Sequence, residues 1–181
     1  AIPGINRRKV VDNAKLHRTL KSYLRFFGPK TLERLTKLWM PVGKRVVIIG
    51  GALQGCQLAE FLVKRGRKVT IVDTAEKLGE GMLSDDPDRL FKWLNKKGAT
   101  MLAQVKYEEI TDEGLVITTK DGVRRVLEAD TIITALPLQP GADLMKSLEG
   151  KVPEVHRIGD YREPGYMYDA IADGSRIGRI I

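Results

Sequence analysis

The sequence has little of the chemistry that disulfides and metal centres require. Among its 181 residues it contains one cysteine, Cys56, and two histidines, His17 and His156. A single cysteine excludes an internal disulfide and a cysteine-ligated iron–sulfur cluster, and two histidines offer little for a histidine-based metal site. We therefore expect no metal centre in this chain. The low cysteine usage also favours a reducing, cytoplasmic location.

Long hydrophobic runs are absent as well. No stretch approaches the roughly 18 uninterrupted apolar residues of a membrane-spanning helix. The first residues, AIPGINRRKVV, lack the apolar segment of a signal peptide. We therefore expect no membrane span and no membrane partner. The content of 43% apolar and 30% charged residues is typical of a globular protein.

Acidic residues are scarce in the first quarter of the chain. Residues 1–45 hold twelve lysines and arginines against two acids, whereas the rest of the chain carries 19 cations and 21 anions. The net charge of +8 therefore originates in this segment. Apolar residues at helical spacing predict a basic helical arm or connector over residues 1–40 that packs against protein. Aromatic residues between the cations leave nucleic acid as a less favoured alternative partner.

After this arm the pattern changes to alternating strands and helices. RVVIIG at residues 45–50 is a continuous apolar run, which is typical of a strand buried on both faces. The periodicity predicts a helix over residues 56–65 and a second strand over 68–73. We expect the first strand of the fold at about Arg45, so that the domain which follows the arm would still fold without residues 1–40.

The remainder of the chain predicts a β-meander within this alternation. Turn sequences DEG and KDG separate three alternating segments between residues 107 and 129, which predicts antiparallel hairpins. The other expected elements are helices over 86–97, 142–148 and 166–179 and strands over 100–105, 131–136 and 155–160. The predicted fold is therefore α/β: a Rossmann-like three-layer fold with a central parallel sheet and an inserted antiparallel β-meander, preceded by the helical basic arm. We expect three segments: the arm at 1–40, a Rossmann-like domain at 41–150 whose ligand the next motif indicates, and a C-terminal strand and helix at 151–181.

A glycine-rich turn joins the first strand of this pattern to its helix. Its residues are Gly50, Gly51, Ala52, Leu53, Gln54 and Gly55. Asp73 ends the next strand, 18 residues after the last glycine, which is the context of a dinucleotide-binding fingerprint. The backbone N–H groups of such a turn can bind a pyrophosphate, and we expect Asp73 and the neighbouring Thr74 at the adenosine ribose. The Asp73 carboxylate favours NAD(H) over NADP(H), because a 2′-phosphate would bring like charge against it.

Ala52 departs from the fingerprint, since it occupies the position of the second glycine. Its methyl group predicts a slightly shifted or weaker dinucleotide, because the pyrophosphate normally approaches the backbone closely there. The alternative is that the glycines serve only the close packing of strand and helix. Asp73 at its spacing favours the nucleotide.

The sequence also resembles a known group of enzymes. GKRVVIIGGALQGCQLAEFLVKRGRKVTIVD, the meander, HRIGD and DAIADGSRIG resemble the pyridine-nucleotide region of two-dinucleotide-binding flavoproteins. Among these, residues 41–181 are most similar to the C-terminal part of NADH:flavin oxidoreductases related to 2,4-dienoyl-CoA reductase and trimethylamine dehydrogenase. Residues 5–40 fit the variable connector of that family.

The resemblance implies an NAD(H)-binding domain that presents NADH for hydride transfer to a flavin. It places Asp160 near the ribityl or phosphate side of that flavin, although a turn or helix-capping aspartate is equally open. FAD or FMN would be bound only in the parent enzyme, whose flavin domain and barrel, or another subunit, would be the partner. We therefore expect a fragment that is inactive alone, and no catalytic residue is assigned.

Two alternatives of other classes are open. One is a nucleotide-binding regulatory or assembly module without redox activity. The other, less favoured, is a basic nucleic-acid-binding protein.

Overall fold

The computed structural model describes residues 2–13, 16, 36, 40–82, 87–136, 143–148, 150–165 and 167–180. The chain forms two compact units, residues 1–136 and 137–181. The helices predicted for the basic arm fall almost entirely outside the described residues. Within the described ranges, no helix has the length and apolar character needed to cross a membrane.

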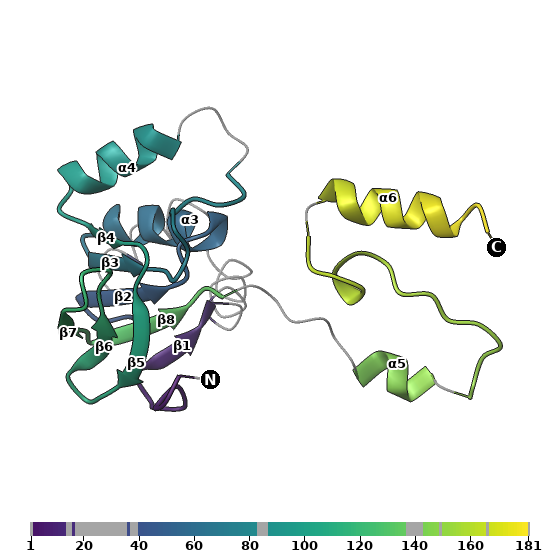
Figure 1. Cartoon of the computed structure of the whole chain (residues 1–181), viewed down its shortest axis with the longest axis horizontal. Helices are drawn as coiled ribbons and strands as arrows, with labels where there is room; N and C mark the ends of the chain where they lie inside the picture. The colour runs from purple at the N-terminus through teal and green to yellow at the C-terminus, as the bar shows by residue number, and fades with distance from the viewer. Residues whose placement is uncertain are drawn as a thin grey trace. The chain divides into compact units, whose positions relative to one another are not determined.

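A parallel five-stranded sheet forms the centre of the first unit (Figure 1). Its strand order is β1-β8-β2-β3-β4. The strands are β1 (Val10–Asp12), β2 (Arg45–Ile49), β3 (Lys68–Val72), β4 (Thr100–Leu102) and β8 (Thr131–Thr134). After Arg45, β2 is a continuous apolar run whose residues are all buried, because both faces of the sheet are covered there.

Two helices cover one face of this sheet. They are α3 (Leu53–Val63), which connects β2 to β3, and α4 (Pro87–Lys96), which connects β3 to β4. Leu58, Leu62 and Leu94 of these helices belong to one core cluster with alternate residues of β2 and β3. The β2–α3–β3 unit therefore has the arrangement that the alternating pattern predicts, with α3 beginning three residues earlier than expected.

An antiparallel sheet covers the other face. Its strands are β5 (Lys106–Ile110), β6 (Gly114–Thr118) and β7 (Arg124–Glu128). They pair in the order β5-β6-β7, as the two turn sequences predict. Leu115 and Ile117 of β6 pack with Val47 and Ile49 of β2 in a second core cluster. Helices, parallel sheet and meander form three layers, which confirms the predicted fold class.

The expectation that the first strand lies at about Arg45 is wrong. β1 pairs in parallel with β8, so that Val10 lies opposite Ile132 and Val11 opposite Ile133. Ile2, Ile5 and Val10 also pack against the second core cluster. The start of the chain is therefore an edge of the central sheet, and the expectation that residues 1–40 are dispensable for folding has lost its basis.

Deleting residues 1–12 is expected to destabilise the first unit. The deletion removes β1 and exposes apolar side chains that are partly buried, at a cost of about 2–4 kcal/mol in the free energy of unfolding. Differential scanning calorimetry of the truncated chain should therefore show a melting temperature several degrees lower. An unchanged melting temperature would restore the view that this segment is dispensable.

The described residues of the second unit form short helices and no sheet. Its elements are α5 (Asp143–Leu148), the 3₁₀ helix η1 (Gly159–Tyr161) and α6 (Met167–Ile177). α5 and α6 confirm the helices predicted for this part of the chain. The strand predicted over residues 155–160 is wrong, since the described residues there form an extended segment that leads into η1. Ile158, which suggested a buried strand, is exposed.

Candidate functional site

The glycine-rich turn lies between β2 and α3, at the carboxyl end of the parallel strands. Gly50 has a φ of +109°, and a Cβ atom there would lie 2.5 Å from the carbonyl oxygen of Ala135. A Cβ atom at Gly55 would lie 1.8 Å from the carbonyl oxygen of Gly50. Glycine at both positions therefore allows the turn to close against β8 and brings α3 against the turn.

Backbone N–H groups at the start of α3 are available to a ligand. Ala52 is the N-cap in extended conformation and makes no side-chain capping hydrogen bond. The Leu53 N–H donates to the carbonyl oxygen of Glu80 at 2.9 Å. The N–H groups of Ala52 and Gln54, by contrast, have no partner among the described residues. Together with the helix dipole, these two groups make the turn a suitable anion site.

The Asp73 carboxylate lies beside this turn, directly after β3. One of its oxygens accepts a hydrogen bond from the Gly51 N–H, and the other accepts one from the Ala75 N–H at 2.9 Å. Each carboxylate oxygen has a second lone pair, so both can still accept a bond from a ligand hydroxyl. Thr74 follows Asp73 and is exposed. The turn, Asp73 and Thr74 are therefore brought together as the sequence predicts.

Tyr107 of the meander supports the carboxyl end of β3. Its hydroxyl donates to the carbonyl oxygen of Val72 at 3.1 Å. Burial, together with the nearby Asp73 carboxylate, raises the pKa of the Tyr107 hydroxyl, so it remains a donor at neutral pH. Tyr107 carries no local sequence signal for this role, because the contact spans 35 residues.

Cys56 is buried at the start of α3, as a packed side chain would be. Its thiol donates to the carbonyl oxygen of Gly51 at 3.1 Å. Burial raises the pKa of the Cys56 thiol to about 11, so the thiol is protonated and unreactive at neutral pH. In the part of the chain that the structure describes, no group of three or more histidine, cysteine or acidic side chains could hold a metal ion.

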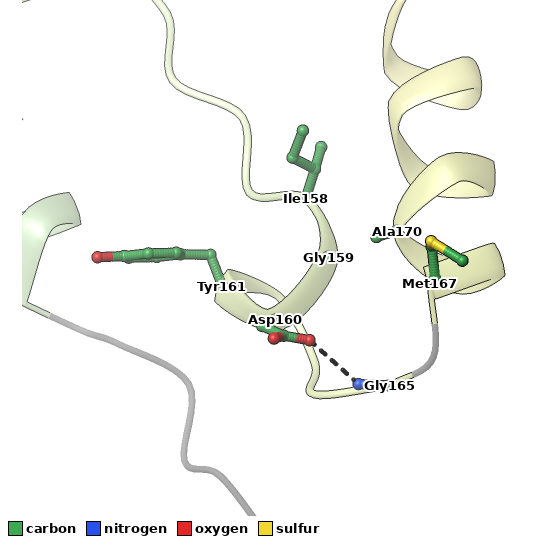
Figure 2. A pocket seen from close by; sticks show the side chains of 7 residues that line it. All are labelled: Ile158, Gly159, Asp160, Tyr161, Gly165, Met167 and Ala170. Atoms are coloured by element: carbon green, nitrogen blue, oxygen red, sulfur yellow. Dashed lines mark hydrogen bonds between the residues drawn. The ribbon is translucent and has the colours of Figure 1, made fainter. Parts of the chain in front are cut away.

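Asp160 belongs to the second unit, in a pocket of about 370 Å³ between η1 and the start of α6. Figure 2 shows its carboxylate directed towards Gly165, whose N–H lies 3.4 Å from the nearer oxygen. Ile158, Tyr161 and Met167 also line this pocket. The carboxylate is exposed and makes only this long hydrogen bond among the described residues, so it can accept others.

Asp173 of α6 holds the loop that carries Asp160, a role that no local sequence pattern indicates. Its buried carboxylate accepts hydrogen bonds from the Gly159 N–H at 3.1 Å and from Arg162 Nε at 2.7 Å. A guanidinium nitrogen of Arg176 lies 3.3 Å from the same carboxylate. Arg162, and to a lesser extent the Gly159 N–H, lowers the pKa of the Asp173 carboxyl below its ordinary value.

The Asp173 interactions predict acid sensitivity of the second unit. Because the folded-state pKa lies below the unfolded value of about 3.9, the stabilisation is present above that pH and is lost as pH falls through the folded-state pKa. Amide hydrogen exchange at Gly159 should therefore become faster, relative to its intrinsic rate, as pH falls below about 4. Asp173→Asn should show fast exchange already at neutral pH. If the Gly159 amide is equally protected from hydrogen exchange in the variant and in the original chain, the result would contradict this role of Asp173.

Comparisons with known proteins show which oxidoreductases the chain is similar to. Residues 6–163 match the family model described as pyridine nucleotide-disulphide oxidoreductase. The NADH oxidase of Thermoanaerobacter brockii is 30% identical over 135 residues, which are 74% of this chain and 21% of that protein. The chain thus spans about a fifth of the length of this relative.

Solved structures show the same fold. A 2-naphthoyl-CoA reductase in complex with 2-naphthoyl-CoA superposes with a TM-score of 0.76 at 25% identity, over 99% of this chain and 24% of that one. The water-forming NADH oxidase of Lactobacillus brevis, bound to NADH, gives a TM-score of 0.54 at 23% identity, over 88% and 32% of the two chains. Its engineered NADPH-oxidase variant, bound to NADPH, gives 0.56 at 23% identity, over 87% and 32%.

Proposed function

Because the chain belongs to the pyridine nucleotide-disulphide oxidoreductase family, we propose that it binds NADH and presents it for hydride transfer to a flavin of a larger enzyme. The observation that carries this proposal is the pair of N–H groups at Ala52 and Gln54, which have no partner among the described residues and lie beside the Asp73 carboxylate. A site that binds an anion, next to a carboxylate that can accept hydrogen bonds from hydroxyl groups, fits a pyrophosphate joined to a ribose.

The residues of the first unit bind and orient the nucleotide. The Ala52 and Gln54 N–H groups receive the pyrophosphate, and the Ala52 methyl group holds it slightly away from the backbone. The Asp73 carboxylate accepts hydrogen bonds from the ribose hydroxyls, and Thr74 lies next to this carboxylate in the chain. NADH supplies the hydride when bound and the flavin accepts it, so the protein contributes position and electrostatics.

Asp73 also determines the preference for NADH over NADPH. The engineered Lactobacillus brevis enzyme supports this assignment: two of its five substitutions replace a glycine and an aspartate by alanine, at positions 18 residues apart. Gly55 and Asp73 have the same separation in this chain. In that enzyme the five substitutions accompany the use of NADPH, as expected when a carboxylate that repels the 2′-phosphate is removed and two arginines that attract it are introduced.

The second unit contributes to the flavin side of the parent enzyme. The exposed Asp160 carboxylate and the open pocket beside it fit a polyhydroxylated chain such as the flavin ribityl. The likeness to 2-naphthoyl-CoA reductase over 99% of this chain supports a place among the NADH:flavin oxidoreductases related to 2,4-dienoyl-CoA reductase and trimethylamine dehydrogenase.

The partner of this unit is the remainder of the flavoenzyme or another subunit. α6 exposes Met167 and Ile171, which are 81% and 66% accessible and lie one helical turn apart. Exposed apolar side chains at this spacing are typical of a surface that protein covers. The chain spans about a fifth to a quarter of the length of these matched proteins. Their greater length supports the proposal that a further part of the protein covers this surface.

The test compares the 181-residue chain with the longest polypeptide expressed from its reading frame. The chain alone is expected to bind NADH with a Kd on the order of 10 µM. It should be colourless and should not reduce added FMN or FAD, whereas NADH should bleach the flavin band of the longer polypeptide under anaerobic conditions. A chain that binds no NADH at millimolar concentration, or a longer polypeptide without flavin, would overturn the proposal.

A further inference from the structure

Gln104 has a backbone conformation that few residues with a side chain adopt. Its φ is +54°, and among the described residues it is the only non-glycine residue with a positive φ. Glycine, asparagine and aspartate are the usual occupants of this left-handed region, whereas glutamine is uncommon there. Residues held in such conformations cluster at ligand sites.

The position of Gln104 connects it to the proposed nucleotide site. Its N–H donates to the carbonyl oxygen of Ala75 at 2.9 Å. The next residue, Val105, donates to the carbonyl oxygen of Asp73 at 3.0 Å. Gln104 therefore lies against the same loop that holds the Asp73 carboxylate, beyond the carboxyl ends of β3 and β4. A nucleotide whose ribose binds Asp73 extends its base along this edge of the sheet.

The side-chain amide of Gln104 is available for recognition. The residue is half-buried, and the amide makes no hydrogen bond within the described part of the chain. A glutamine amide offers one donor group and one acceptor in a plane, which matches the N7 acceptor and the N6 amino donor of adenine. A hydrophobic or charged side chain at this position would not offer that pair.

We propose that Gln104 recognises the adenine base of the dinucleotide and is a specificity-determining residue of the site. This inference rests on the proposed binding of NADH at the glycine turn and Asp73. It predicts selectivity for the base, whereas Asp73 determines selectivity at the ribose. The two selectivities can therefore be measured separately.

The test uses NADH and its hypoxanthine analogue, in which the adenine amino group is replaced by a carbonyl oxygen. The full chain is expected to bind NADH about tenfold more tightly than the analogue by calorimetry, which corresponds to about 1.4 kcal/mol. Gln104→Gly, which relieves the backbone conformation, should bind both compounds equally and NADH about tenfold more weakly. Its ratio of NADH to NADPH affinity should equal that of the original chain, because Asp73 is unchanged.

The outcomes separate this inference from the function it rests on. If the original chain binds no NADH, both fail. If it binds NADH but does not discriminate the analogue, or if Gln104→Gly retains the discrimination, the assignment of Gln104 fails and the proposed function stands. Circular dichroism of the variant provides the check that it is folded.

Discussion

Gly55→Val is expected to abolish NADH binding and to destabilise the first unit. A Cβ atom at this position would lie 1.8 Å from the carbonyl oxygen of Gly50, and the two further methyl groups of valine add to this overlap, so α3 must move away from the turn. Overpacking of this kind costs about 3 kcal/mol in the free energy of unfolding. The displaced helix no longer presents the Ala52 and Gln54 N–H groups to the pyrophosphate. We expect at least about a 100-fold loss of NADH affinity, or about 2.8 kcal/mol, in a calorimetric titration.

Gly66→Ala is the matched control, because Gly66 follows the other end of the same helix. Its φ of +73° makes alanine unfavourable by about 1 kcal/mol. No atom lies within 4 Å of the added Cβ, so α3 need not move. The control should therefore lower stability slightly and leave NADH affinity unchanged. Equal NADH affinities of Gly55→Val and the original chain would show that the pyrophosphate does not bind at this turn.

Asp73→Ala is expected to remove the preference for NADH. In the original chain we expect NADH to bind about tenfold more tightly than NADPH, equivalent to about 1.4 kcal/mol. Two unit charges about 4 Å apart repel by roughly 1 kcal/mol in water and roughly 4 kcal/mol at an intermediate dielectric, and salt keeps the value near the lower limit. Alanine removes this repulsion and also the acceptor for the ribose hydroxyls, so the two affinities converge mainly because NADH binds more weakly.

A second variant separates charge from structure at this position. The Asp73 carboxylate also accepts the Gly51 and Ala75 N–H groups, so alanine leaves two donors without this partner. Asp73→Asn removes the charge but keeps one acceptor oxygen. It should narrow the preference for NADH over NADPH and lower the stability of the chain less than Asp73→Ala does. Tighter binding of NADPH than of NADH by the original chain would contradict the assignment of Asp73. Lys77, an exposed cation in the same loop, would then be the residue to test.

The β2–α3–β3 unit and the meander could be predicted because each carries a local signal. Apolar runs, helical spacing and glycine turns indicate where these elements begin and end. Asp73 could be placed beside the glycine turn because parallel neighbouring strands end at the same edge of a sheet. For the same reason, the predicted turn residues and Asp73 lie together in the structure.

The remaining features depend on contacts between distant parts of the chain. β1 is three residues long, and only its pairing with β8, more than 100 residues later, makes it a strand. Ile158 belongs to an apolar pattern that resembles a strand, but the described residues of the second unit include no strand with which it could pair. The positive φ of Gln104 and the buried carboxylate of Asp173 likewise have no local signature. Such features become visible only once the tertiary structure is known.

The central claim is that NADH binds at the glycine turn, and an NMR titration of the isotope-labelled chain tests it most directly. On addition of NADH, the amide resonances of Ala52 and Gln54 are expected to shift, because their N–H groups receive the pyrophosphate. Gly66 and Gly98 precede β3 and β4 and therefore lie at the amino ends of these strands, opposite the turn. Their amide resonances should not shift. Shifts confined to other parts of the chain, or no shift at the turn with saturating NADH, would contradict the claim.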